Sequence, residues 1–276
     1  MAKKQLLDID AGNLFENSPK TDLSTTCYAG FIFLDDKNLR LCPSWKTPKD
    51  GRLKIVYHED FRIPEYLPIN GEDYKITEIG KFTFPKSMES IYIPASITKI
   101  EEFPFNISPR AELSKIHVSK DNRYYDSRED CNAIIETATN TLITACNDTI
   151  IPDSVEKIGA GAFCDVALKS LYIGPNIVYI NSGFADIFGL ETIIVSENNR
   201  YYDSRENCNA IIETATNTLV KGCKTTKIPF SVKRIGVSSF ETTGELKSYC
   251  IPANIELIDD YAFCNCTQIQ LINATF

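Results

Sequence analysis

Six short segments of the chain repeat one hydrophobic pattern, in which an isoleucine is followed closely by a phenylalanine. The phenylalanine comes five residues later in five segments and four residues later in the sixth. Successive isoleucines lie 21 to 23 residues apart at the short spacings and 55 to 58 residues apart at the long ones. A period of about 20–29 residues is typical of stacked strand repeats, and the long spacings add an insertion of roughly 30 residues. The six pairs are Ile79 and Phe84, Ile100 and Phe105, Ile158 and Phe163, Ile180 and Phe184, Ile235 and Phe240, and Ile258 and Phe263.

Each repeat also contains a short alternating run. The runs IYIP, LYIG and YCIP predict strands in which every second side chain points inward. Proline ends a strand because it cannot donate to the ladder, so we expect strands to end at Pro94, Pro152, Pro229 and Pro252. The phenylalanines are expected to enter the same core from a turn or a single helical turn. One repeat cannot bury this apolar face alone, so the repeats are expected to stack into a solenoid.

The insertions carry a duplicated stretch. NRYYDSREDCNAIIETATNTL, from Asn122 to Leu142, returns 77 positions later with one change, Asp130 to Asn207. Chance does not produce such identity, so the chain grew by internal duplication. The two inserts lie near residues 119–148 and 196–225.

Each insert reads as a β-hairpin for which two registers compete. A two-residue loop at Ala138-Thr139 would place Cys131 opposite Cys146 and favour a disulfide. A three-residue loop ending at Asn140 would put that asparagine in the left-handed conformation that it tolerates. A shift of one residue would exchange the two faces of the hairpin, so the register is set by which face is buried. We expect the second register because it places apolar or small residues together on one face. That face would hold Cys131, Ala133, Ile135, Ile143 and Ala145, and Cys208, Ala210, Ile212, Val220 and Gly222 in the second copy; Ile134 and Leu142 would share a mixed face with Asn132, Glu136 and Thr144.

In the second register the paired cysteines of each hairpin, Cys131 with Cys146 and Cys208 with Cys223, point to opposite faces and are not bridged.

Tyrosine and arginine precede each hairpin, and both residue types are enriched in binding hot spots. The candidate partner-binding residues are therefore Tyr124, Tyr125, Arg128, Tyr201, Tyr202 and Arg205. A structural interpretation is favoured over this one, because alternation sends adjacent tyrosines to opposite sides. It buries one tyrosine of each pair while Asp126 and Asp203 cap the turn through side-chain hydrogen bonds.

The pattern I-x-x-I-G-x-x-x-F followed by L-x-x-I-x-I-P resembles the BspA-like family of bacterial leucine-rich repeat proteins, and so does the insert with its following cysteine and Ile-Pro. The resemblance covers about residues 60–276. It implies a mainly β fold with short helical turns, arranged as a right-handed leucine-rich-repeat solenoid with β-hairpin inserts. On this basis we expect an N-terminal arm and β-rich cap at residues 1–70, and the solenoid at 71–276.

Charge and composition narrow the function. A net charge of −8 and a pI near 5.0 argue against nucleic-acid binding. The sequence has no apolar run of 18 residues, so it predicts no membrane-spanning helix. The N-terminus lacks a signal-peptide pattern, which taken at face value predicts the cytoplasm, whereas the resemblance implies a cell-surface or secreted protein.

No motif in the sequence indicates an enzyme, a cofactor or a metal site. Cys264-Asn-Cys266 is the one close cysteine pair, and both histidines, His58 and His117, lie far from it in sequence. Gly159-Ala-Gly161 lacks the third glycine of a nucleotide loop, and Asp8-Ile-Asp10 lacks the later acidic positions of a calcium loop. The expected function is non-catalytic protein recognition, of an adhesion-related kind, through the strand-lined face or through projecting inserts.

The alternative function is a structural or self-assembling module. The C-terminal sequence QIQLINATF is strand-like and has no polar capping repeat after it. An uncovered edge of this kind pairs readily with a second copy. A glycan-binding or small-molecule-binding face would instead require clustered aromatic residues and carboxylates.

Overall fold

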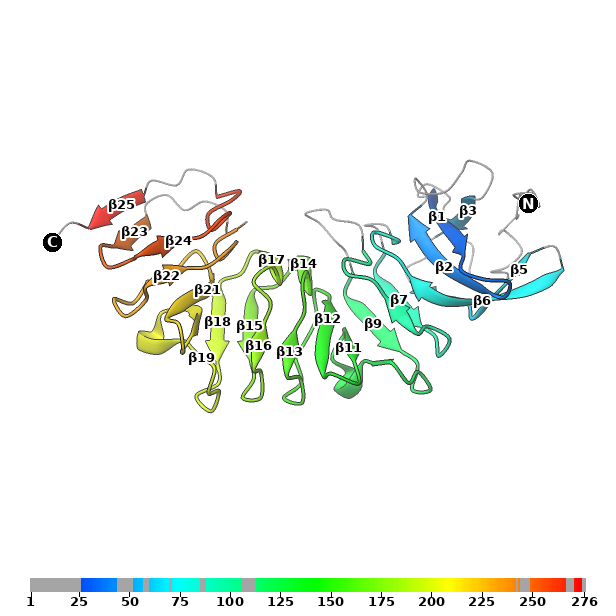
Figure 1. The fold of residues 1–276 in the computed structure, drawn as a ribbon, viewed down its shortest axis with the longest axis horizontal. Helices are drawn as coiled ribbons and strands as arrows, with labels where there is room; N and C mark the ends of the chain where they lie inside the picture. The colour runs from blue at the N-terminus through cyan, green and yellow to red at the C-terminus, as the bar shows by residue number, and fades with distance from the viewer. Residues whose placement is uncertain are drawn as a thin grey trace.

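The computed structural model describes residues 26–43, 52–56, 60–69, 71–84, 88–105, 113–241, 243, 249–266 and 271–274. The N-terminal arm expected over residues 1–25 lies outside this part of the chain. The described residues are mainly β, and their units stack along a curved axis with β1–β3 at one end and β23–β25 at the other (Figure 1).

The repeated isoleucines form short parallel ladders, in addition to the strands expected at the alternating runs. Within these ladders Ile79 lies opposite Ile100, Ile158 opposite Ile180, and Ile235 opposite Ile258. The paired strands are β6 (Glu72–Ile79) with β8 (Lys99–Ile100), β13 (Lys157–Ile158) with β16 (Tyr179–Ile180), and β22 (Arg234–Ile235) with β24 (Leu257–Ile258).

The phenylalanines stack in a second column. Ring centroids lie 5.4 Å apart for Phe84 and Phe105, and 6.2 Å apart for Phe163 and Phe184. Phe184 keeps its place in the column although it follows its isoleucine by four residues. Next to this column β14 (Phe163–Ala167) pairs in parallel with β17 (Ala185–Phe188).

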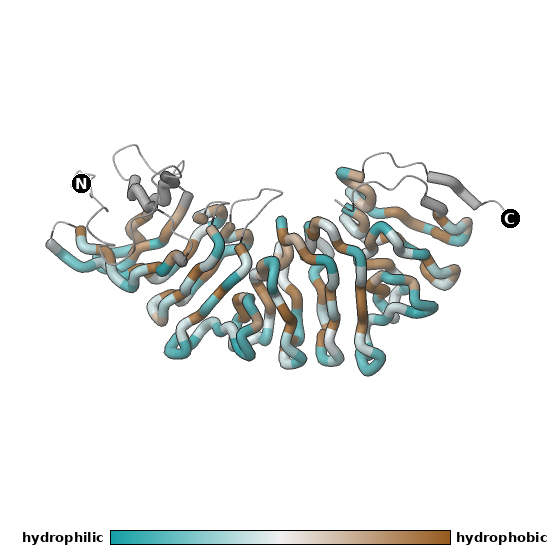
Figure 2. The backbone as a smooth tube through the Cα atoms, turned by 180° about the vertical axis from the view of Figure 1, so that it is seen from behind, coloured by the Kyte–Doolittle hydropathy of each residue, from teal (hydrophilic) through white to brown (hydrophobic). Residues whose placement is uncertain are grey.

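A third set of ladders is built from the alternating runs. These strands are β4 (Asp60–Arg62), β7 (Ser90–Ile93) and β9 (Lys115–Val118) in one sheet, β15 (Ser170–Ile173) with β18 (Thr192–Val195), and β23 (Tyr249–Pro252) with β25 (Leu271–Ala274). Hydrophobic and hydrophilic positions alternate along the strands (Figure 2).

The strands expected before Pro152 and Pro229 do not form. The Ile150 amide donates to the Cys131 carbonyl instead, and the Lys227 amide donates to the Cys208 carbonyl. These amides are therefore bonded to the insert and do not donate to a neighbouring strand.

The duplicated stretches contain the hairpins β11 (Ala133–Glu136) with β12 (Thr141–Ala145), and β20 (Ala210–Glu213) with β21 (Thr218–Gly222). The two-residue-loop pairing holds near the turn, where Ile135 faces Leu142, and the three-residue-loop pairing holds beyond it, where Ile134 faces Thr144. A bulge at Ile143 joins the two, so the prediction of a single register was wrong. Asn140 has φ +50°, as predicted.

The hairpins are part of the stack and do not project from it. β12 pairs in parallel with β13, which places Leu142 opposite Ile158, and β21 pairs with β22, which places Leu219 opposite Ile235. The hairpin strands therefore occupy positions in the isoleucine ladders.

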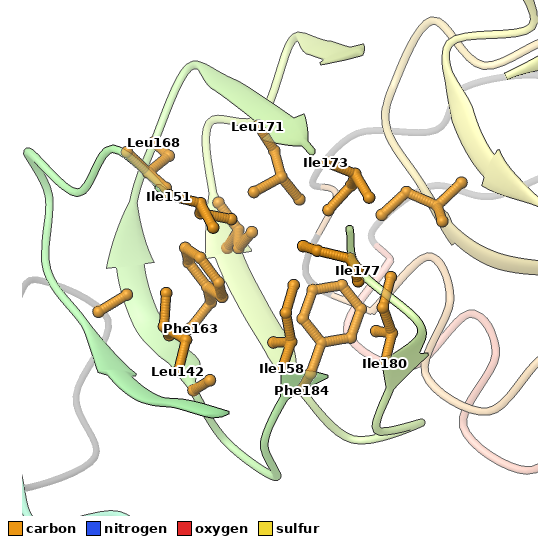
Figure 3. Close-up of a cluster of buried hydrophobic side chains, with 14 of the residues drawn as sticks. Leu142, Ile151, Ile158, Phe163, Leu168, Leu171, Ile173, Ile177, Ile180 and Phe184 are labelled. Atoms are coloured by element: carbon orange, nitrogen blue, oxygen red, sulfur yellow. The ribbon is translucent and has the colours of Figure 1, made fainter. Parts of the chain in front are cut away.

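Both faces of each hairpin are buried, which corrects the expectation of one apolar and one mixed face. The first hairpin lies between two core clusters: Ala133, Ile135 and Leu142 belong to the central cluster, and Ile134 to the N-terminal one. Cys131 and Cys146 enter different clusters, as predicted, and both thiols are free. The central cluster also holds Ile158, Ile177 and Phe184, whose side chains point toward one another (Figure 3).

The N-terminal strands join the first isoleucine ladder in one sheet. β1 (Thr26–Phe33) pairs with β2 (Asn38–Pro43) and with β3 (Arg52–Val56), and β2 continues the ladder into β6. β5 (Tyr66–Ile69) forms a hairpin with β6 around Gly71, which has φ +81°.

Candidate functional site

Each insert begins with a tyrosine that closes the end of an isoleucine ladder. Tyr125 in β10 (Tyr125–Asp126) and Tyr202 in β19 (Tyr202–Asp203) are buried. The Ile100 amide donates to the Tyr125 hydroxyl at 2.9 Å, and the Ile180 amide donates to the Tyr202 hydroxyl at 2.8 Å. Among the described strands, β8 and β16 have no further partner on this side, so the tyrosine hydroxyl accepts the hydrogen bond that a next strand would have accepted. Burial raises the pKa of Tyr202 to about 12 against the opposing effect of this hydrogen bond, so the hydroxyl stays neutral at ordinary pH.

Asn122 and Asn199, which we did not single out in the sequence, fasten each insert to the preceding repeat. The Asn122 side chain accepts from the Tyr124 and Tyr125 amides and donates to the Pro94 and Ile97 carbonyls. Asn199 repeats all four bonds in the second copy. A side chain with all four hydrogen bonds made inside the protein is structural.

Arg128 holds the wall of the insert together. Its guanidinium binds both carboxylate oxygens of Asp126, at 2.7 and 2.6 Å, and reaches Asn140 in the hairpin turn at 3.0 Å. Asp126 also caps the turn by accepting from the Arg128 amide, as the structural interpretation predicted. Burial would raise the pKa of Asp126, but the hydrogen bonds and the charge of Arg128 outweigh it and hold the pKa below its usual value. Arg205 makes the equivalent contacts with Asp203 and Asn217.

Tyr124 and Tyr201 point the other way, and each side chain is half exposed. Of the six residues predicted to bind a partner, only these two tyrosines expose a ring. Tyr125 and Tyr202 are enclosed, and the arginines are engaged with the aspartates. The binding role of all six stays a prediction.

The inserts border two equivalent grooves. The first groove has a cavity of about 960 Å³. Its floor is the outer face of β4, β7 and β9, and its wall is the 3₁₀ turn η4 (Arg128–Asp130). The Val118 amide donates to the Ser127 hydroxyl at 3.0 Å and fixes the wall against the floor. The second groove, of about 770 Å³, lies between β18 and the turn η5 (Arg205–Asn207), where the Ile193 amide donates to Asn209 at 2.6 Å. Sequence patterns did not predict the grooves, because they form between strands and turns of different segments. Arg128 and Arg205 are the predicted residues that line them.

The hairpins differ at two buried positions, where Thr144 and Ala145 of the first copy correspond to Lys221 and Gly222 of the second. Thr144 of the first copy is replaced by Lys221, whose side chain is 1% exposed and whose ammonium donates to the Glu241 carbonyl at 3.3 Å. Burial lowers the pKa of Lys221 to about 8, although Asp186 and Glu241 oppose the shift. Nearby, ligand atoms of Cys164, Asp165 and Asp186 lie within 4.8 Å of one another, a set that the sequence did not indicate. Burial, with the charges of both aspartates, raises the pKa of the Cys164 thiol well above its ordinary value, so the sulfur is a weak ligand there.

Most of the stacked repeats match a known protein family. A sequence model described as BspA type leucine rich repeat region matches in six copies, over residues 69–144 and 139–270. The chain belongs to this family. The match covers β6 and the later isoleucine strands, both inserts and both groove walls, while β4 of the first groove floor lies before it.

Solved structures of bacterial leucine-rich repeat proteins are similar to this chain. The pneumococcal vaccine antigen PcpA has a TM-score of 0.51 and 16% identity, over 89% of this chain and 68% of PcpA. A leucine-rich cell surface protein from Faecalibacterium prausnitzii has a TM-score of 0.43 and 21% identity, over 94% of this chain and 78% of its own length. A search of curated proteins found no match. Among the described residues, no helix has the length and apolar character needed to cross a bilayer.

Proposed function

We propose that this BspA-type chain is a non-catalytic protein-recognition module that acts in adhesion at a cell surface and binds extended protein segments in its two grooves. The surface location is proposed from the family. The proposal includes a right-handed solenoid over residues 71–276 behind an arm and β-rich cap at residues 1–70.

The observation that carries the proposal is the duplication of a groove with a rigid wall. Arg128 and Arg205 fix the two walls with equivalent bonds, and Ser127 and Asn209 tie them to the floor strands. A site that is ordered before binding loses less conformational entropy when a partner docks, which favours affinity. Cavities of about 960 and 770 Å³ are also within the usual range of ligand sites.

Selection from a random library of displayed 12-residue peptides tests this function on the full chain. Lys115→Trp and Thr192→Trp each place a large ring on an exposed floor position, one in each groove. Lys99→Trp is the matched control, because Lys99 is an exposed lysine on a ladder strand outside the residues that line either groove.

Enriched peptides should bind the chain and the Lys99→Trp variant, and lose binding to at least one groove variant. Peptides that bind all three variants equally would show that the grooves are not the site. Failure to enrich any peptide would contradict peptide recognition itself.

A second candidate function is self-assembly, as favoured by the C-terminal strand. Within the described residues β25 pairs with β23 alone, so its other edge has no strand beside it. The solution mass of the full chain, beside a chain that ends before Gln268, tests this candidate. A dimer that becomes monomeric on truncation would favour assembly, and monomers in both cases would exclude it.

A further inference from the structure

The flanks of the two duplicated stretches have changed in a patterned way. LSKIHVSKD, residues 113–121, corresponds to LETIIVSEN, residues 190–198. The buried positions are kept: Leu113, Ile116 and Val118 correspond to Leu190, Ile193 and Val195. By contrast, each of the exposed positions 115, 117 and 120 carries a different residue in the second copy.

General surface drift does not explain this difference. The adjoining duplicated stretch, residues 122–142, has exposed positions too, among them Arg123, Tyr124 and Glu129, and these are identical in the second copy. Over the duplicated stretch only Asp130 differs, as Asn207. The walls of the two grooves therefore differ only at Asp130 and Asn207, whereas the floors differ at each of the three exposed positions 115, 117 and 120.

The floor of the first groove presents Arg62 and His117 in register on either side of an aromatic ring. Across the three parallel strands Arg62 lies opposite Tyr92, and Tyr92 lies opposite His117. The Arg62 guanidinium lies 4.8 Å from the centre of the Tyr92 ring. Neighbouring strands are about 4.8 Å apart, so this row spans roughly 10 Å across the floor.

Two lysines extend the cationic floor. Lys115 on β9 and Lys120 in the following turn are exposed and line the same groove. Among the ion pairs of the described residues, none includes Arg62, Lys115 or Lys120. In a chain of net charge −8, these cations stand out as a local exception.

The acidic residues of the first groove lie mostly on its other side. Asp126 is neutralised by Arg128 within the wall, and Glu129 and Asp130 belong to η4. Of the four carboxylates that line this groove, Asp121 alone lies outside the wall, directly after Lys120 in the chain. Charge is thus separated across the groove, with cations on the floor and carboxylates along the wall.

The strand beside the second groove keeps an aromatic residue, but the floor of that groove lacks the cations. Tyr172 lies opposite Ile194, as Tyr92 lies opposite His117. Thr192 and Glu197 stand where the first groove has Lys115 and Lys120. Its sheet contains only β15 and β18 among the described strands, so no strand carries a counterpart of Arg62.

We propose that the first groove selects an extended acidic peptide, whose carboxylates contact Arg62, Lys115 and His117, and that the second groove does not. An extended peptide presents alternate side chains on opposite sides, so it can direct acidic residues to the floor and other residues to the acidic wall. Arginine binds carboxylates in a bidentate manner, which suits this role. The inference rests on the proposed function, because it names the partner class of one of the two grooves.

The probe is a fluorescent ten-residue peptide of alternating glutamate and threonine, titrated against the full chain. It is compared with an alternating lysine and threonine peptide and with a heparin fragment. The variant Lys115→Thr/His117→Ile/Lys120→Glu transplants the second floor into the first groove. It uses residues that the same fold already accepts at the equivalent positions, and its unfolding midpoint serves as a check that it folds.

The acidic peptide should bind one site, more weakly as salt is raised, and the triple variant should weaken it by about tenfold or more. The reciprocal variant, Thr192→Lys/Ile194→His/Glu197→Lys, should add a second, weaker site. The inference is overturned if the triple variant binds unchanged, if the reciprocal variant gains nothing, or if the lysine peptide binds as well.

Tighter binding of the heparin fragment to the same floor would assign the groove to a polyanionic glycan and would also overturn it. Non-acidic peptides enriched in the library selection and blocked by Lys115→Trp would refute this inference while the proposed function stands.

Discussion

Removal of the Tyr125 or Tyr202 hydroxyl tests how much the hydrogen bond from the last amide of a ladder to this hydroxyl stabilises the fold. In Tyr202→Phe the ring stays and the Ile180 amide loses its acceptor, which lies 2.8 Å away in a buried site. A donor left buried without a partner costs about 1–3 kcal/mol. In Tyr125→Phe the Ile100 amide is only partly buried, so we expect the lower end of that range.

Equilibrium unfolding in urea and by heat, followed by circular dichroism, measures these losses. Each kcal/mol should lower the melting temperature by about 2–4 °C in a chain of this size. Tyr124→Phe and Tyr201→Phe are matched controls, because each alters the half-exposed neighbour and should change stability by less than about 0.5 kcal/mol.

The duplication supplies a further check on the same reasoning. Tyr125→Phe and Tyr202→Phe lie in different sheets and share no hydrogen-bond partner, so their effects should add within about 0.5 kcal/mol. If Tyr202→Phe unfolds at the same urea concentration as Tyr201→Phe, the hydroxyl does not stabilise the ladder end and the account is refuted.

Three further predictions concern buried groups. Gly222→Ala would place a methyl group 2.2 Å from the Phe240 ring, so it should destabilise the chain by about 1–3 kcal/mol in urea unfolding; a neutral result would show that the ring can move. The pKa of Lys221 is about 8 in the folded chain and 10.5 in the unfolded chain, so between these pH values the folded state binds fewer protons than the unfolded state. The free energy of unfolding should therefore rise by about 3 kcal/mol between pH 8 and pH 10.5, and it should rise less in Lys221→Met. Burial raises the pKa of Cys131 and Cys146 to about 11, so both should react with a thiol reagent at pH 7 far more slowly than the same cysteines in urea, and equal rates would contradict their burial.

The repeat pattern was predictable because ladder contacts recur at every unit. Ile79, Ile100 and the later isoleucines occupy matching positions, and their spacing was enough to align the repeats, although it did not show that the isoleucines themselves lie in strands. The strands expected before Pro152 and Pro229 failed for a non-local reason, since the amides that would have joined a ladder bind the insert.

The register of the hairpin could not be settled from its own residues. Each of the two registers satisfies half of the hairpin, and a bulge at Ile143 lets both hold at once. The sequence favoured one buried face because a hairpin at a surface has one. Here a second core cluster covers Ile134 as well, and this depends on how the hairpin packs between its neighbours.

The candidate site was predictable only in part. Alternation correctly predicted that one tyrosine of each pair is buried, but it did not show that this is Tyr125, or that its hydroxyl accepts from the Ile100 amide 25 residues earlier in the chain. The groove floor places Arg62 and His117 on either side of Tyr92 across three strands, and no local pattern predicts that arrangement.

The junction made by the tyrosine hydroxyl bears on how such a chain can change in length. One ladder ends at Ile100 and the next at Ile180, and a tyrosine from the duplicated stretch binds each end. These tyrosines, Tyr125 and Tyr202, lie 77 positions apart. Recombination between the near-identical stretches would delete or add one whole unit, and the new neighbours would meet through a junction that the chain already uses. We therefore expect natural length variants of this chain to differ by multiples of 77 residues, each added unit bringing one more groove, and variants that differ by fractions of a unit would contradict this expectation.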